Sequence, residues 1–364
     1  MKITRLEPIL IAIPYRHGGP IPEGGGAPWR TMDTQLLRVE TDAGLTGWGE
    51  AFGFGACPAT KTATERLVAP LAIGRDPRDI AALMTELARK LHNFGRNGPV
   101  SFALSGLDIA LWDIAGKIAG APLHRLLGGS GKGRVPAYAS LLRYGAADLV
   151  ARNAAAAVER GYRQIKLHEI GIAEIAAGRR AIGAEIALML DANCAWPADE
   201  AVAMARRLRE NDLLWLEEPV WPPEDHHGLA RVRRDGGIAV AAGENAGTPA
   251  EFEHLIDRAA VDYLQPSVTK VGGISAMQRI IAHAESRGVA VAPHSPYFGP
   301  GLIATLHLIA ASPLERVCER FYCDLEASPF GDAVEARGGF MRVPSGAGLG
   351  VAIDERVIAR YRTG

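Results

Sequence analysis

Cysteine is scarce in this sequence, with four residues in a chain of 364. None of the four belongs to a C-x-x-C pair, which argues against a zinc ribbon or a thiol redox motif. So few cysteines suit a reducing cytoplasm, and we expect them to behave as small, buried hydrophobic residues. They are Cys57, Cys194, Cys318 and Cys323.

Long hydrophobic runs and an excess of charge are also lacking. No apolar stretch approaches the ~20 residues that a helix needs to cross a bilayer. The apolar run near the N-terminus is too short for a signal peptide and is broken by Glu7 and Pro8. The chain has 40 basic and 41 acidic residues, a formal net charge of −1. We therefore expect a cytoplasmic protein that binds neither nucleic acid nor membranes.

Apolar residues are abundant enough for a large core, at 48% of the chain. The length exceeds that of a usual single core and predicts a barrel with a smaller domain. We predict an α+β domain over residues 1–125, a barrel over 126–329, and a C-terminal segment over 330–364 that packs on the first domain. The first domain should contain a strand near 1–14, a hairpin over 34–41 and 45–52 with Gly44 in the turn, and helices near 60–72, 77–92 and 101–119.

From Val135 onward, eight short apolar runs alternate with seven helical segments. This alternation is typical of an α/β fold in which parallel strands close into a barrel. Polar residues end seven of the strands at intervals of 24 to 27 residues. Because barrel active sites lie at the C-terminal strand ends, these side chains should converge. They are Lys166, Asp191, Glu217, Glu244, Lys270, His294 and Glu319.

Carboxylates end three consecutive strands of this predicted barrel, at Asp191, Glu217 and Glu244. Three bare carboxylates would repel one another, and a hard divalent cation removes that repulsion. An all-oxygen set of ligands favours Mg²⁺ over Zn²⁺. The alternative is that each carboxylate pairs with a nearby Arg or Lys. Glu218 adjoins Glu217, but strand alternation lets one of the two face inward, and register favours Glu217.

Groups that can transfer protons flank the three carboxylates. Lys166 and His168 lie two residues apart on the second strand, so both can face the barrel mouth. Lys270 and His294 end the sixth and seventh strands, on the opposite flank. A metal would stabilise the charge that forms when the proton beside a substrate carboxylate is removed, so His or a lysine with a lowered pKa could serve as base. The alternative is a structural role for each of these residues, in salt bridges or backbone hydrogen bonds.

A set of short segments along the chain is specific in combination. The segments are TGWGEA, ALSGLDIALWDIAGKIAGAPLHRLLGG, LMLDAN, WLEEP, AGEN, KVGG, PHS and PSGAGLGV. Together they resemble the mandelate racemase and muconate-lactonizing branch of the enolase superfamily. The resemblance covers nearly the whole chain and implies an α+β capping domain over a modified (β/α)₇β barrel. It also implies a homo-oligomer and a Mg²⁺ cofactor used with a Lys or His base.

The resemblance implies a role for each flanking residue of the second and seventh strands. Lys166 matches the first lysine of the family K-x-K motif, which usually neutralises the substrate carboxylate, but the second position holds His168. We carry the role of base to His168. The racemase branch pairs the seventh-strand histidine with an aspartate of the sixth strand. The matching segment here is Gln-Pro-Ser at 265–267, so His294 lacks that carboxylate and should be less basic.

Two further catalytic residues and the substrate pocket follow from the same resemblance. Lys270 aligns with the sixth-strand lysine of the lactonizing and dipeptide-epimerase branch. Glu319 resembles the acid that hydrogen-bonds the substrate carboxylate, with Asp324 as the alternative. Arg30 and Tyr297 are predicted to bind substrate. Other candidates for the pocket wall are His17, Trp29, Phe52, Phe54 and Phe298.

The sequence leaves the reaction open among several hypotheses, all beginning with removal of the α-proton through an enediolate intermediate. Dehydration of a sugar acid or related hydroxy acid to a 2-keto acid is favoured, with His168 or Lys270 as base and His294 as acid. Racemisation or epimerisation with His168 and Lys270 as opposed bases is the second hypothesis, and cycloisomerisation of a lactone is the third. A binding protein without catalysis is disfavoured, because buried carboxylates are costly without a metal.

Overall fold

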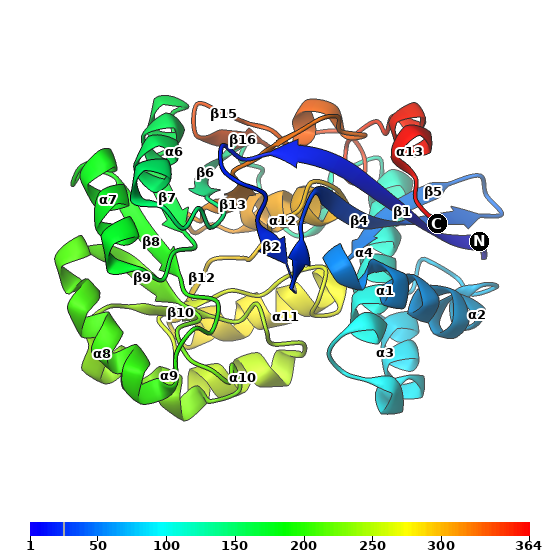
Figure 1. The fold of residues 1–364 in the computed structure, drawn as a ribbon. Helices are drawn as coiled ribbons and strands as arrows, with labels where there is room; N and C mark the ends of the chain where they lie inside the picture. The colour runs from blue at the N-terminus through cyan, green and yellow to red at the C-terminus, as the bar shows by residue number, and fades with distance from the viewer. Residues whose placement is uncertain (25) are drawn as a thin grey trace.

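The structure, a computed structural model, describes residues 1–24 and 26–364. Figure 1 shows a barrel of strands ringed by helices beside a smaller sheet that carries its own helices. Both chain termini lie at the outer end of the smaller unit. The fold is therefore α/β with an N-terminal capping domain and a barrel, as the sequence predicts.

The capping domain is built on a long antiparallel sheet. The hairpin that joins its second and third long strands turns at Gly44, whose φ of +76° is the left-handed conformation that glycine adopts freely. A Cβ at Gly49 would lie 1.9 Å from the carbonyl oxygen of Gly106, so glycine at this position lets a helix approach the sheet closely. The strand order is β14 (Asp324–Leu325), β1 (Ile3–Arg16), β4 (Thr31–Thr41) and β5 (Thr46–Ala51), and a short pair, β2 (Glu23–Gly24) and β3 (Ala27–Pro28), lies outside this sheet.

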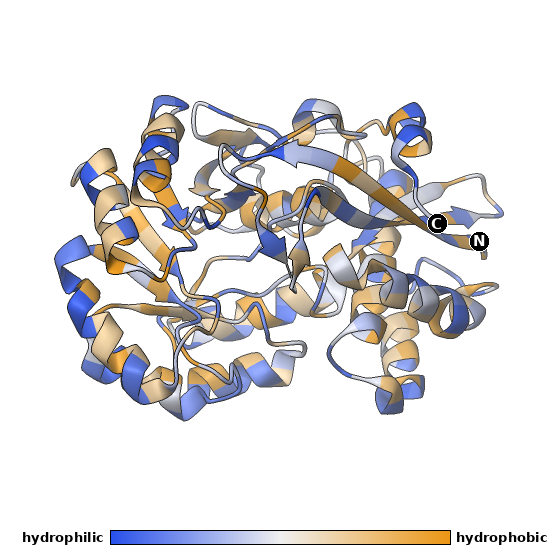
Figure 2. Ribbon diagram, viewed as in Figure 1, coloured by the Kyte–Doolittle hydropathy of each residue, from blue (hydrophilic) through white to orange (hydrophobic). Residues whose placement is uncertain are grey.

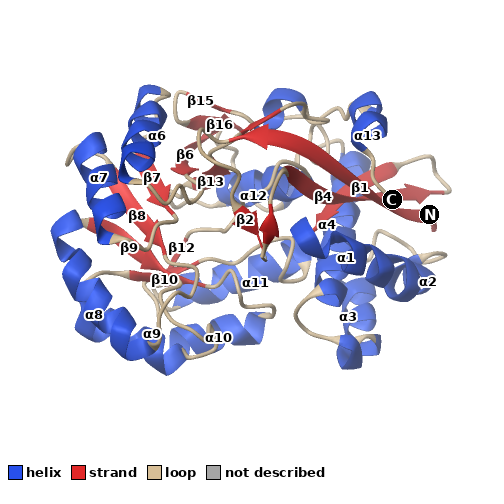
Figure 3. Cartoon of the chain, viewed as in Figure 1, coloured by secondary structure: helices blue, strands red, loops and turns tan. Residues whose placement is uncertain are grey.

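Helices cover one face of this sheet (Figure 3). The helix predicted near 60–72 is divided in the structure by a π-helical turn at Thr64–Val68. Asp79 caps the next helix, accepting a hydrogen bond from the Ala82 N–H at 3.1 Å. The helices are α1 (Cys57–Ala63), α2 (Ala69–Ala72), α3 (Ile80–Lys90), α4 (Pro99–Ala119) and α5 (Leu123–Leu126), with 3₁₀ turns at Phe54–Ala56 and His92–Phe94.

Eight parallel strands form the barrel, at the positions that the sequence predicts. The ladder runs without a break from the seventh strand to the first, and the eighth pairs with the first on its other side. Ser295 joins the seventh strand to the eighth, since its N–H donates to Glu319 Oε2 at 2.8 Å. The strands are β6 (Arg134–Ser140), β7 (Gln164–Leu167), β8 (Ala187–Asp191), β9 (Leu213–Glu217), β10 (Val240–Ala242), β11 (Tyr263–Leu264), β12 (Ala290–Val291) and β13 (Cys318–Phe321).

Seven helices follow the first seven strands and surround the barrel (Figure 1). In all but the last of them, the apolar side faces the strands and the hydrophilic side faces outward (Figure 2). The last helix is buried along nearly its whole length. None of the helices in the described part of the chain is long and apolar enough to span a bilayer. They are α6 (Ala147–Glu159), α7 (Ile172–Ile182), α8 (Ala198–Leu208), α9 (His226–Gly236), α10 (Pro249–Asp257), α11 (Gly273–Ser286) and α12 (Pro300–Ala311), with a 3₁₀ turn at Arg209–Asn211 after α8.

The barrel interior is a packed core below the strand ends. Tyr138, Met189, Trp215, Ala241 and Ala292 form one buried cluster there. The indole N–H of Trp215 donates to Glu217 Oε2 at 3.0 Å, so the core also supports one of the strand-end carboxylates. Filling the barrel in this way leaves the C-terminal mouth as the place for chemistry.

The C-terminal region contacts both units. A hairpin of β15 (Ala336–Arg337) and β16 (Phe340–Arg342), preceded by a 3₁₀ turn at Gly331–Val334, adds β16 antiparallel to barrel strand β6. The last helix, α13 (Glu355–Tyr361), leads to a backbone hydrogen bond from Thr363 to Leu10 of β1 at 2.9 Å.

Two aspartates of α4 tie the motif-rich segments together. Asp113 accepts hydrogen bonds from the N–H groups of Trp48 at 2.9 Å and of Leu349 at 2.8 Å. Asp108 accepts from Ser275 at the start of α11, and burial raises the pKa of this carboxyl to about 7. Helix α4 thus fastens the capping sheet, the tail and the barrel to one another.

Candidate active site

Three carboxylates converge at the mouth of the barrel. Asp191 and Glu217 are the last residues of β8 and β9, and Glu244 lies two residues after β10. One oxygen of each residue lies within 4.8 Å of the others. Glu218 turns away with a φ of +40° and accepts a hydrogen bond from the Gly243 N–H at 2.9 Å. Glu217, rather than Glu218, therefore belongs to this cluster.

The pKa values of the three clustered carboxylates shift in different directions. Burial and the neighbouring Asp191 raise the pKa of Glu217 well above its ordinary value, although Lys166 acts in the opposite sense. Burial would also raise the pKa of Asp191, but Lys166 and His168 lower it overall. Oxygen ligands around Mg²⁺ lie at about 2.1 Å, so opposite ligands are about 4 Å apart. The spacing and chemistry of the three residues fit a hard divalent cation.

Lys166 is the counter-ion buried beneath the cluster. Its Nζ lies 2.7 Å from Glu217 Oε1, 2.9 Å from Glu319 Oε1 and 3.4 Å from Asp191 Oδ2. Its side chain is fully buried. Burial alone would lower the pKa of this amine, but Glu217 and Glu319 raise it well above its ordinary value. Lys166 is therefore charged and binds the carboxylates of three strands to one another.

His168 lies on the same flank as Lys166 but reaches the cavity. Its Nε2 is 3.2 Å from Asp191 Oδ2, and its Nδ1 is 2.5 Å from the carbonyl oxygen of Leu141. A carbonyl oxygen can only accept, so Nδ1 carries the proton and donates it. Nε2 is then the nitrogen that exchanges a proton with a molecule in the cavity.

Lys270 lies on the opposite flank. Its Nζ donates to the backbone oxygen of Glu244 at 2.7 Å and lies 4.3 Å above the ring centre of Phe52. Burial lowers the pKa of this lysine, and the nearby Glu244 and Glu218 compensate only in part. A lowered pKa brings an amine nearer to the range in which it can accept a proton.

His294 joins Lys270 on this flank. Its Nε2 lies 2.7 Å from Glu244 Oε2, and its Nδ1 lies 3.1 Å from Ser267 Oγ. Ser267 Oγ also hydrogen-bonds the hydroxyl of Tyr297. The partner of His294 on this side is thus a chain of two hydroxyls. The sequence indicated that an aspartate was missing there, but it did not indicate what replaced it.

A cavity of about 320 Å³ opens over the carboxylates. Glu319, His168, Lys270 and His294 all line it, whereas Tyr297 lies behind His294 and Arg30 is exposed outside it. Trp29, Phe52 and Phe54 form an aromatic wall from the capping domain, as expected. His17 is buried, stacks on Tyr144 with ring centres 5.4 Å apart, and does not line the cavity. Residues that sequence reasoning missed are Pro22, Glu23, Leu142, Arg143, Asn193, Pro296 and Phe321.

Family comparisons agree with this geometry. Residues 28–128 match the family described as mandelate racemase / muconate lactonizing enzyme, N-terminal domain, and residues 149–357 match the one described as enolase C-terminal domain-like. The chain belongs to the mandelate racemase and muconate-lactonizing branch of the enolase superfamily.

Relatives within this superfamily act on sugar acids. The chain is 35% identical over 350 residues to D-galactarolactone cycloisomerase of Agrobacterium fabrum, covering 90% of each protein. It is 32% identical over 343 residues to arabinonate dehydratase of Saccharolobus solfataricus, covering 91% of each. A crystal structure of L-talarate dehydratase from Polaromonas sp. JS666, complexed with Mg and L-glucarate, matches with a TM-score of 0.86 at 31% identity, covering 100% of this chain and 97% of that one.

These relatives indicate the class of enzyme to which this chain belongs. It is an enzyme of the dehydratase or cycloisomerase kind, and small carboxylate sugar acids are the substrates that its relatives imply. The three carboxylates, together with the magnesium of a structural relative, point to a divalent metal.

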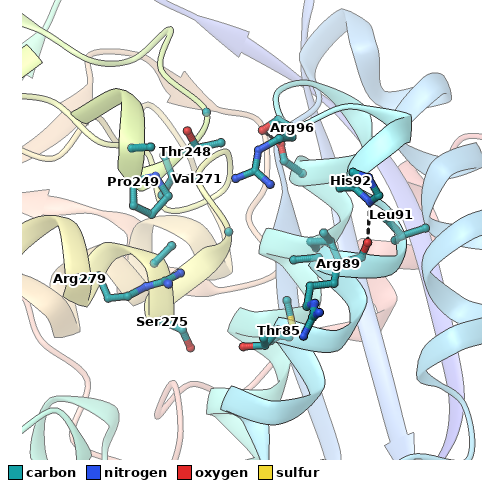
Figure 4. Close-up of a pocket in the computed structure, with 18 of the residues that line it drawn as sticks. Thr85, Arg89, Leu91, His92, Arg96, Thr248, Pro249, Val271, Ser275 and Arg279 are labelled. Atoms are coloured by element: carbon teal, nitrogen blue, oxygen red, sulfur yellow. Dashed lines mark hydrogen bonds between the residues drawn. The ribbon is translucent and has the colours of Figure 1, made fainter. Parts of the chain in front are cut away.

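A larger cavity, of about 1200 Å³, shares no lining residue with the cavity over the carboxylates. It separates α3 and α4 of the capping domain from α11 and the start of α10 (Figure 4). Arg96 and Arg279 extend into it from opposite walls, with Arg89 on the α3 side (Figure 4). Within the described residues none of these three arginines has an ion-pair partner, and the cavity lining contains no carboxylate.

Proposed function

We propose that this protein is a Mg²⁺-dependent dehydratase that converts a sugar acid, or a related hydroxy acid, to a 2-keto acid. The observation that carries the proposal is the placement of His168 and His294 on opposite sides of the carboxylate cluster. His168 Nε2 lies 3.2 Å from Asp191, and His294 Nε2 lies 2.7 Å from Glu244. Elimination of water needs one group to take a proton and another to give one, and this pair supplies both.

Asp191, Glu217 and Glu244 would hold the cation. When bound, Mg²⁺ supplies a Lewis acid for the substrate carboxylate, which makes the adjacent C–H more acidic. Lys166 adds a fixed positive charge below the cluster, and its amine is held by Glu217 and Glu319. These residues together prepare the mouth of the barrel for a substrate that becomes more negative during the reaction.

The proton transfers follow from the two histidines. His168 Nε2 removes the proton from the carbon beside the carboxylate, because the hydrogen bond to Leu141 keeps the ring proton on Nδ1. His294 gives a proton to the hydroxyl of the next carbon, so that the C–O bond breaks and water leaves. The enol that remains gains a proton at that carbon and loses its hydroxyl proton, giving the 2-keto acid. Lys270 is the alternative base.

The contacts of His294 support its role as acid. Its Nδ1 faces the hydroxyl of Ser267, which can donate or accept, whereas Nδ1 of His168 faces a carbonyl oxygen that can only accept. The ring of His294 can therefore carry its proton on Nε2, which lies 2.7 Å from Glu244 Oε2. A proton in that place is the one that a leaving hydroxyl can take.

Cycloisomerisation of a sugar-acid lactone is the second candidate. The 35% identity to D-galactarolactone cycloisomerase favours it. His168 and His294 would again act as base and acid, and the oxygen of the lactone ring would be the leaving group in place of a hydroxyl. The product then has the mass of the substrate, whereas dehydration gives a product lighter by one water.

Product analysis separates these reactions. Sugar acids and their lactones are incubated with the protein and Mg²⁺ in D₂O, and the products are identified by mass spectrometry and NMR. Loss of water with a 2-keto product supports the proposal. An isomeric product without loss of water supports the cycloisomerase. Deuterium uptake with inversion of configuration, and no other change, would replace both by a racemase or epimerase.

A further inference from the structure

Arg143 is a cation at the mouth of the site cavity that the proposed chemistry does not use. It lies in the loop that follows β6, and it lines the cavity together with His168, Glu244 and His294. Its Nε donates to the carbonyl oxygen of His168 at 2.5 Å. Within the described residues no carboxylate lies in ion-pair range of its guanidinium group, even though Glu23 lines the same cavity.

This hydrogen bond prepares the guanidinium group for a ligand. With Nε fixed on a backbone oxygen, the side chain loses part of its rotational freedom before any ligand arrives. Both Nη atoms stay available, and such a pair matches the two oxygens of a carboxylate. Arg143 is exposed at the mouth of the cavity, so these two nitrogens are open to a ligand that enters from solvent.

The other cation of the cavity is already engaged. Lys270 donates to the Glu244 backbone and lies over the Phe52 ring. Much of the remaining wall is aromatic, from Trp29, Phe54 and Phe321. Among the described lining residues, Arg143 is therefore the cation that offers two unpaired nitrogens to a second anionic group of a substrate.

The position of Arg143 relative to the metal ligands sets the kind of molecule that fits. His168 contacts Asp191 through its imidazole and Arg143 through its carbonyl oxygen. The two places for a carboxylate are therefore separated by a single residue. An open sugar chain of five or six carbons can reach across one residue.

We propose that the substrate is a sugar diacid, with one carboxylate at the metal ligands and the other on the guanidinium group of Arg143. This inference rests on the proposed function, because it names the acid that the dehydratase takes. It makes Arg143 the residue that separates diacids from monoacids. The geometry assigns it to binding, so its loss should raise KM for diacids more than it lowers kcat.

Matched pairs of acids test the inference. Galactarate and glucarate carry a carboxylate at both ends of the chain. Galactonate and gluconate carry a hydroxymethyl group in place of the second carboxylate. The preference is the ratio of kcat/KM for the diacid to kcat/KM for the monoacid, measured with Mg²⁺ for the wild type, Arg143→Met, Arg143→Lys and Arg180→Met. Arg180 is an exposed residue of α7 and serves as the matched control.

We expect the wild type to prefer the diacid, and Arg143→Met to reduce this preference on the order of 10-fold, as the loss of an exposed hydrogen bond to a charged group does. Arg143→Lys should keep part of the preference, since lysine retains the positive charge but lacks the paired N–H groups of a guanidinium. Arg180→Met should keep all of it. Equal or better turnover of monoacids by the wild type would overturn the inference and leave the dehydratase intact. An unchanged preference in Arg143→Met would also overturn it, and turnover of no acid at all would overturn both.

Discussion

The two cavities of this molecule differ in both size and charge. The smaller, of about 320 Å³, lies over a carboxylate cluster with a buried lysine beneath it. The larger, of about 1200 Å³, is lined by helix surfaces and three arginines without ion-pair partners among the described residues. Parallel strands deliver their side chains to one fixed place, whereas the larger cavity is a space between two units. The convergence of opposed charges, rather than volume, marks the site of chemistry.

The largest effect should come from removing the charge beneath the smaller cavity. Lys166→Met leaves Glu217, Glu319 and Asp191 without their shared counter-ion. We expect kcat to fall at least ~10³-fold, and the free energy of unfolding to fall by about 3–5 kcal/mol. Activity assays and thermal unfolding with and without Mg²⁺ measure both. An unfolding temperature equal to that of the wild type would mean that Lys166 does not bind the strands together.

His168→Asn should abolish proton removal. Asparagine keeps a polar group of similar size but cannot act as a base at neutral pH, so we expect kcat to fall ~10²–10⁴-fold. The deuterium content of recovered substrate in D₂O should fall to the level without enzyme. Lys270→Met is the matched variant on the opposite flank and should retain exchange. The reverse result would transfer the role of base to Lys270.

His294→Asn should separate proton removal from loss of water. Because His294 serves the leaving hydroxyl, we expect 2-keto acid formation to fall ~10²–10⁴-fold while the α-proton still exchanges with solvent. NMR of the substrate in D₂O follows the exchange, and mass spectrometry follows the product. Retained dehydration in this variant would show that another group donates the proton.

A smaller effect is expected at the hydroxyls behind His294. Ser267→Ala removes the partner of Nδ1, and Tyr297→Phe removes the next hydroxyl in the chain. Loss of one neutral hydrogen bond costs about 1 kcal/mol, so kcat should fall about 5–10-fold while KM changes little. Ser267→Thr keeps a hydroxyl and should restore part of the rate. A loss as large as that of His294→Asn would assign the hydroxyls a direct part in proton transfer.

The larger cavity should contribute least to the reaction. Arg89→Ala and Arg96→Ala remove charges from a cavity that shares no lining residue with the one over the carboxylates. We expect kcat/KM to stay within about twofold, and the free energy of unfolding to change by about 0.5 kcal/mol or less, as for surface positions in general. A marked loss of activity would show that the larger cavity, and not only the smaller one, contributes to catalysis.

The sequence predicts the barrel well because its signal is local and repeated. Each strand is a short apolar run, and each ends in a polar residue such as Asp191 or Glu217 that the fold brings to one edge. The order of the strands then determines which residues converge. The resemblance to the family, rather than the strand pattern, gave Trp29, Phe52 and Phe54 as candidates for the pocket wall.

What the sequence could not predict depends on contacts between distant segments. The sequence allowed a salt bridge for Lys166, but not its full burial among three carboxylates, since a lysine in a strand is usually solvated. The Ser267–Tyr297 pair joins residues 30 positions apart through a geometry that neither segment encodes alone. Arg143 lies three residues beyond the end of β6, outside the pattern of polar strand ends. The rule of strand ends therefore missed it.

The most direct test of the account is the dependence of α-proton exchange on metal. The protein is stripped of metal with EDTA and incubated in D₂O with a sugar acid that it converts, before and after Mg²⁺ is restored. The variant Glu244→Gln is treated in the same way. We predict that exchange and product formation stop on stripping, return with Mg²⁺ in the wild type, and stay at least ~10²-fold lower in Glu244→Gln. Exchange that continues in the stripped protein, or that Glu244→Gln retains in full, would contradict the assignment of Asp191, Glu217 and Glu244 as the metal site.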